Sequence, residues 1–194
     1  MLKRIKKIGF WFIAVLFTAI VVMVIFSPFT KKGTNDYRSV DYTVEINAPA
    51  ETVFNYLGNS DNAADWSSYV DHISTLNAEQ YKDGELGSIR RCYKNKNEEG
   101  ILWDEEILAV TSNKKRVLSI YNMQGFASPI NGLETEQIYE AISAHKTQLT
   151  FSLCFAMHEA SWFETLKMYL ASYTIYNRFK DNLENVKRLV EFDL

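Results

Sequence analysis

Residues 44–66 read VEINAPAETVFNYLGNSDNAADW, and this stretch decides the fold. Apolar and polar residues alternate over residues 40–46, which is the pattern of a half-buried strand. Pro49 then suits the first turn of a helix, because the N–H that proline lacks would have no partner there. Gly58 is a typical helix end. The stretch therefore predicts a strand that leads into a short amphipathic helix.

A second, much longer helix is predicted at the C-terminus. Ser161 and Glu164 form a capping box, in which each side chain accepts a hydrogen bond from the backbone N–H of the other residue. Apolar and aromatic residues then recur at steps of three and four, namely Trp162, Leu166, Tyr169, Tyr173, Tyr176, Phe179, Leu183, Val186 and Val190. So long an apolar face needs a partner, and a curved antiparallel sheet fits this need.

The chain between the two helices is rich in strand patterns. Five runs alternate or are rich in β-branched and aromatic residues: 87–95, 101–110, 116–123, 134–143 and 147–157. Residues 68–76 are a weaker candidate. The short polar links between these runs favour consecutive antiparallel hairpins.

The N-terminal region is predicted to be a membrane anchor. Residues 8–26 carry no charge and would span roughly 28 Å as a helix, close to the ~30 Å hydrocarbon core of a bilayer. The four cations within residues 1–7 favour a cytoplasmic N-terminus. A cleaved signal peptide is the alternative, but its apolar run is shorter and ends in a small-x-small site. We therefore expect a protein of the cell membrane with a single-pass helix over residues 8–26. A linker over 27–39 would join this helix to an extracytoplasmic domain over 40–194.

Charge and cysteine content narrow the function of the domain. Six of the 21 Lys and Arg residues lie before residue 33, which leaves 15 against 24 Asp and Glu and a formal net charge of −9. A domain this acidic repels phosphate backbones, so we predict no nucleic-acid partner. Cys92 and Cys154 both fall in strand patterns, which favours two buried free thiols over a disulfide.

The order of these elements resembles the START-like (SRPBCC) superfamily, which includes polyketide cyclase/dehydrase-like and lipid-transfer proteins. The resemblance covers residues 40–192 and rests on VEINAPAETVF (44–54), Asp65-Trp66, Gly84-x-x-Gly87, Trp103-x-Glu105, KRVLSIY (115–121) and KTQLT (146–150). It implies an α+β helix-grip fold, in which a seven-stranded curved antiparallel sheet wraps around the C-terminal helix. It also implies an apolar cavity for a hydrophobic molecule. Such proteins share no universal catalytic motif, so the resemblance assigns no catalytic residue.

The most informative polar residue is Glu105. Alternation places it on the same face of strand 101–110 as Trp103, Ile107 and Ala109. If that face lines the cavity, the carboxylate would orient a ligand hydroxyl or act as general acid or base. The alternative, which the sequence favours, is a cross-strand pair with Arg90 or Arg91.

Ligand contacts are predicted on both the sheet and the final helix. The predicted ligand-binding residues are Trp103, Glu105, Phe151, Trp162, Tyr169, Tyr173 and Tyr176. The glycine- and proline-containing loop 125–132 is a candidate gate. The histidines, at His72, His145 and His158, do not have metal-ligand spacing, and nucleophile and phosphate-loop motifs are missing. We therefore predict no metal and no cofactor.

These patterns favour a membrane-anchored binding module for a hydrophobic small molecule or lipid over an enzyme. One alternative is a polyketide cyclase or dehydratase-like enzyme that uses Glu105, the sole and weak catalytic candidate. Another is an interaction domain of a membrane complex.

Overall fold

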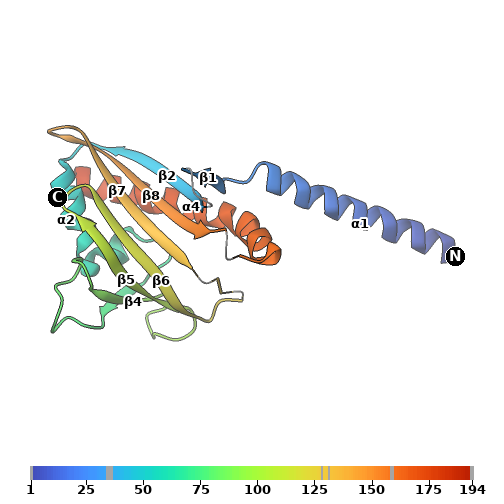
Figure 1. The fold of residues 1–194 in the computed structure, drawn as a ribbon, viewed down its shortest axis with the longest axis horizontal. Coiled ribbons are helices and arrows are strands. Elements are labelled where there is room, and N and C mark those ends of the chain that lie inside the picture. The colour runs from blue at the N-terminus through green and yellow to red at the C-terminus, as the bar shows by residue number, and fades with distance from the viewer. Residues whose placement is uncertain (1, 34–36, 128, 131, 158–159, 193–194) are drawn as a thin grey trace.

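The computed structural model describes residues 2–33, 37–127, 129–130, 132–157 and 160–192 (Figure 1). Its helices are α1 (Leu2–Ile25), α2 (Ala50–Gly58), α3 (Ala63–Trp66) and α4 (Trp162–Phe192), with a 3-10 turn η1 (Ser60–Asn62). Its strands are β1 (Thr30–Lys32), β2 (Tyr37–Ile46), β3 (His72–Thr75), β4 (Ile89–Tyr93), β5 (Leu102–Thr111), β6 (Lys115–Gln124), β7 (Leu133–Ser143) and β8 (Lys146–Ala156).

The strands form one antiparallel sheet in the order β1-β2-β8-β7-β6-β5-β4-β3, and α4 runs along it (Figure 1). This arrangement confirms the predicted α+β helix-grip. The described residues contain eight strands in this sheet, so the predicted count of seven was wrong.

The additional strand is β1, which lies in the segment predicted to be a linker. Thr30 pairs with Ser39 of β2, which places β1 at the edge of the sheet. Phe29, just before β1, is 2% exposed and makes an edge-to-face contact with Tyr169 of α4 at 5.3 Å between ring centroids. Burial of this aromatic side chain favours the ordered strand, because it removes a large apolar surface from water.

Two clusters of buried side chains hold α4 against the sheet. One is at the C-terminal half of the helix, where Leu183 and Val186 pack with Phe54 of α2. The other is at the N-terminal half, where Met168 packs with Phe29. The predicted capping box begins this helix, since Ser161 Oγ accepts from the Glu164 N–H at 3.2 Å and Glu164 Oε2 accepts from the Ser161 N–H at 2.9 Å.

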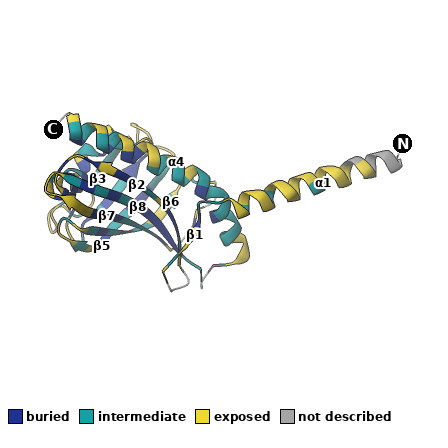
Figure 2. Cartoon of the chain, turned by 90° about the horizontal axis from the view of Figure 1, so that it is seen from above, coloured by how far each residue is buried: buried dark blue, intermediate teal, exposed yellow. Residues whose placement is uncertain are grey.

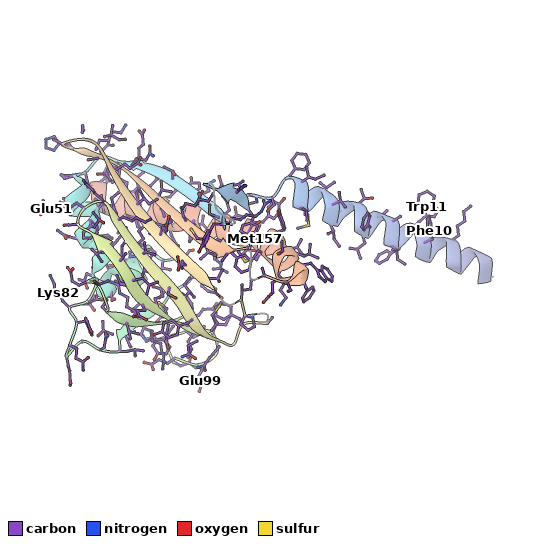
Figure 3. All side chains as sticks on the ribbon, viewed as in Figure 1. Phe10, Trp11, Glu51, Lys82, Glu99 and Met157 are labelled. Carbon is purple, nitrogen blue, oxygen red and sulfur yellow. The ribbon has the colours of Figure 1, made fainter. Side chains whose placement is uncertain are left out.

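Helix α1 projects away from the grip, and its described side chains are mostly exposed (Figure 2). Phe10 and Trp11, labelled in Figure 3, are 66% and 60% exposed. The helix meets the grip at its C-terminal end, where the Tyr173 hydroxyl donates to the Met23 carbonyl at 2.7 Å. Among the residues that the structure describes, no helix has both the length and the apolarity that a membrane span requires. The membrane span predicted over residues 8–26 is therefore not supported.

Strand β5 departs from the strict alternation that the sequence predicts. A register irregularity lies between Ile107 and Ala109, where β5 pairs with β6. Beyond it Ala109 is exposed, and Val110 packs against the core instead. A β-bulge explains the change of face, because one extra residue in a strand shifts every later side chain to the opposite side.

Candidate functional site

A cavity of about 460 Å³ lies between α4 and the inner face of the sheet. Its walls are mainly apolar, with contributions from Leu118, Ile120, Leu153, Met168 and Ile175. Ligand pockets in proteins commonly have volumes of about 300–1,000 Å³, whereas a cavity for one or two waters needs only a few tens. The grip therefore encloses space of the size that a small organic ligand occupies.

Strand β5 supplies a carboxylate to the inner wall. Trp103 and Glu105 both line the cavity, and Trp103 Nε1 donates to Glu105 Oε1 at 2.9 Å. Glu105 lies directly opposite Arg90 in the pairing of β4 and β5, as the cross-strand prediction expected, but the two candidate arginines form ion pairs with other carboxylates. Arg91 donates twice to Asp104, at 2.7 and 2.8 Å, and Arg90 donates to Asp83 at 2.9 Å. The cross-strand neighbour was therefore predicted correctly, but neither arginine forms an ion pair with Glu105, and its carboxylate faces the cavity.

The Cys92 thiol also lines the cavity beside Glu105. It is free, as is Cys154. Burial raises the pKa of Cys92 well above its usual value, and the negative charge of Glu105 raises it further. The sulfur therefore stays protonated, so Cys92 behaves as a small apolar wall residue and not as a nucleophile.

A buried polar network closes the end of the cavity near α2. Arg116 Nη1 donates to Gln137 Oε1 at 3.0 Å and to the Tyr139 hydroxyl at 3.2 Å, and that hydroxyl donates to Gln137 at 2.8 Å. Burial lowers the pKa of Arg116 and raises that of Tyr139. We did not predict this network, although the signal was present: alternation in β6 places Arg116 on the same face as Leu118.

The opposite end of the cavity is covered by an aromatic stack. Tyr69, in the loop between α3 and β3, lies 5.9 Å from Trp103 with an angle of 22° between the rings. The Arg178 guanidinium carbon lies 3.6 Å from the centroid of the Tyr69 ring. Phe126, in the predicted gate loop, contacts Trp103 at 6.1 Å. Tyr69 therefore connects the sheet to α4 across this end of the cavity.

A family model described as polyketide cyclase/dehydrase and lipid transport matches residues 37–191. The chain belongs to this family. The match runs from β2 to residue 191 in α4, so it includes seven of the eight strands and excludes α1 and β1. No curated protein shows a significant sequence match to the chain.

Solved structures show the same grip. The ZhuI aromatase/cyclase from Streptomyces sp. R1128 has a TM-score of 0.57 at 18% identity, with 81% of this chain and 98% of that chain covered. XoxI from Bacillus cereus has a TM-score of 0.57 at 15% identity, with 78% and 94% covered. The Aha1 protein from Colwellia psychrerythraea has a TM-score of 0.54 at 16% identity, with 79% and 96% covered. At these identities the likeness supports the fold alone.

Three of the predicted ligand contacts line the cavity of this polyketide cyclase/dehydrase and lipid transport domain: Trp103, Glu105 and Phe151. The structure places the four on α4 elsewhere. Trp162 is 77% exposed, and the hydroxyl of Tyr173 bonds to α1. Tyr169 packs on Phe29, and Tyr176 on Tyr42, at 5.3 and 5.4 Å.

Another side of α4 faces the cavity. The residues there include Met168, Ala171, Ile175, Arg178, Phe179 and Asn182. Because the helix has apolar neighbours on more than one side, its sequence pattern does not distinguish the cavity side from the side that packs on β1 and β2.

Metal-ligating side chains do not gather in the part of the chain that the structure describes: it contains no group of three or more His, Cys, Asp or Glu residues arranged to hold an ion. His158, one of the three histidines considered from sequence, lies outside the described residues. The same holds for positions 128 and 131 of the gate loop.

Proposed function

We propose that this domain binds a hydrophobic small molecule or lipid in the cavity between α4 and the sheet. The observation that carries the proposal is the largely apolar cavity of about 460 Å³. Apolar ligands gain roughly 25 cal/mol for each Å² that they remove from water, so a largely apolar space of this size provides substantial binding free energy. The family description, which includes lipid transport, agrees with this function.

Filling the cavity tests the proposal. Ala171 lies on the cavity side of α4, so Ala171→Trp places an indole where a ligand would lie. Ala109→Trp adds the same side chain at an exposed position of β5 and is the matched control. Binding of an apolar fluorescent dye to the full chain should be lost in the first variant and retained in the second. Near-ultraviolet circular dichroism checks that both variants are folded. A wild-type chain that binds no dye and releases no ligand on lipid extraction would overturn the proposal.

The second candidate function is an enzyme of the cyclase or dehydratase type. The specific observation is the Glu105 carboxylate on the cavity wall, positioned by the Trp103 indole N–H at 2.9 Å. In a dehydration, Glu105 would take a proton from the carbon next to a substrate carbonyl and return a proton to the departing hydroxyl, which leaves as water. Glu105→Gln keeps the shape and removes the base. Unchanged turnover of polyketide substrates in this variant would exclude the role.

We also propose that α1 brings the domain to a membrane. This proposal is supported by the uncharged sequence of residues 8–26 and by the exposure of the apolar side chains that the structure describes there, such as Phe12 and Phe17. The cytoplasmic N-terminus and the extracytoplasmic domain remain predictions from the flanking charges. Cell fractionation of the full chain and of a chain without residues 1–26 is the test. Equal recovery of both in the soluble fraction would refute membrane attachment.

A further inference from the structure

Arg178 is a cation on the cavity wall whose hydrogen-bond donors have no carboxylate partner among the described residues. Within the described chain, the Arg178 guanidinium stacks on the Tyr69 ring, and the distance from the guanidinium carbon to the ring centroid is 3.6 Å. Arg90, which also lines the cavity, differs in this respect. It donates to Asp83 at 2.9 Å and to the Gly58 carbonyl at 2.6 Å. Arg178 therefore has donors to offer to a ligand, whereas Arg90 is occupied by the fold.

Asn182 places a second donor beside Arg178. The two residues are four apart on α4, so they share one face of the helix, and both line the cavity. Asn182 Oδ1 accepts from the backbone N–H of Ser68 at 2.7 Å. Since only the oxygen of an amide side chain accepts, this bond fixes the orientation of the group and leaves the Asn182 NH₂ as a donor. The α4 wall thus offers a guanidinium and an amide NH₂ one turn apart.

The opposite wall sets the orientation of a charged ligand. Glu105 lies on β5, and its carboxylate disfavours a second negative charge close to it. An anionic group is therefore favoured at the α4 wall, where Arg178 has no carboxylate partner among the described residues. One guanidinium matches a single negative charge, and its planar fork matches the two oxygens of a carboxylate.

We propose that the cavity ligand is an amphipathic monocarboxylate, whose carboxylate binds Arg178 and Asn182 and whose apolar body fills the cavity. This assignment rests on the proposed binding function and specifies its ligand class. Tyr69 holds the guanidinium in place by stacking, so less side-chain freedom is lost when the carboxylate binds.

The test compares two ligands that share a chain and differ in the head group. Dodecanoic acid and dodecan-1-ol are titrated calorimetrically into the full chain, kept in solution by an amphipathic polymer, at pH 8. Arg178→Met should weaken dodecanoate by about tenfold or more and dodecanol by less than twofold, because a charge-assisted hydrogen bond is lost only for the acid. Arg178→Lys should retain part of the affinity for the acid, since the charge remains.

Lys180→Met is the matched control, because it removes an exposed cation two residues away on the same helix. It should leave both affinities unchanged. If Arg178→Met weakens acid and alcohol equally, or leaves the acid unaffected, the carboxylate assignment is wrong while the binding function stands. Tighter binding of dodecyl phosphate than of dodecanoate would also overturn it. If the wild-type chain binds neither compound and no dye, the proposed function fails, and the ligand class with it.

Discussion

Replacing Asp83 with alanine should lower the free energy of unfolding by about 3 kcal/mol. The Arg90 side chain, its ion-pair partner, is 4% exposed, and that of Asp83 is 24% exposed. Asp83 accepts from Arg90 Nε at 2.9 Å, and from the N–H and Oγ of Ser60 at 2.7 and 2.9 Å. Breaking a buried ion pair by removing one partner costs about 3–5 kcal/mol. The partial exposure of Asp83 and the remaining bond from Arg90 to Gly58 place the expected cost at the lower end.

Urea unfolding of the full chain, followed by near-ultraviolet circular dichroism, measures this cost. Asp61→Ala, at an exposed position in the same region, is the control and should change stability by less than about 0.5 kcal/mol. In the double variant Asp83→Ala/Arg90→Met, at least about 1 kcal/mol should be recovered, because the unpaired buried charge is removed as well. A loss below about 1 kcal/mol in Asp83→Ala, or no recovery in the double variant, would refute the reasoning.

Three further outcomes are expected. Gly84→Ala should destabilise the fold by at least about 2 kcal/mol in the same unfolding assay, because φ is +81° and a Cβ would lie 2.4 Å from a carbonyl oxygen of α2. Gly132 has a similar φ of +72°, but a Cβ there would have no atom within 4 Å, so Gly132→Ala should cost only about 1 kcal/mol. Equal costs in the two variants would show that the close approach of residue 84 to α2 does not matter. Cys92 should resist iodoacetamide at pH 8 until the chain unfolds, as judged by mass spectrometry, since burial raises its pKa; native-state labelling would contradict this. Burial raises the pKa of Asp104, but hydrogen bonds, chiefly from Arg91, bring it below its ordinary value. Its stabilisation is therefore present above its unfolded-state pKa of about 3.9 and is lost as pH falls through the lower folded-state pKa. The destabilisation in Asp104→Asn, about 1–2 kcal/mol at pH 7, should accordingly shrink below about pH 4, and a constant difference would contradict the assignment.

Strand β5 shows what residue patterns predict and where they stop. Alternation placed Trp103 and Glu105 on one face, and both line the cavity. The same pattern failed at Ala109, because the bulge after Ile107 depends on how β5 pairs with β6. It also offered two arginines as partners for Glu105, and the fold paired each of them with another carboxylate. A local pattern thus identifies a face of a strand, and here even the residue opposite Glu105, but it does not identify which side chains form ion pairs.

The candidate binding site shows even more clearly that local sequence patterns do not identify residues that meet through the fold. Arg178 and Asn182 are polar and do not belong to the predicted apolar face of the final helix, so the sequence pattern did not mark them as site residues. In the structure they lie on the cavity wall with Tyr69, which is more than 100 residues away in sequence. Their proximity comes from the crossing of α4 over the loop after α3, and no short stretch of sequence contains that information.

Local residue patterns were enough to predict the order of helices and strands, the capped C-terminal helix and the family resemblance. These features rest on alternation, helical periodicity and capping residues, all of which act between residues close together in the chain. The three-dimensional packing was needed to show that β1 joins the sheet and that Ala171 and Arg178, not Tyr169 and Tyr173, face the cavity. The physical reason is that α4 is covered on several sides, by the sheet, by α3 and by the end of α1. An apolar pattern marks burial on all of these sides, and only long-range packing distinguishes the filled sides from the hollow one.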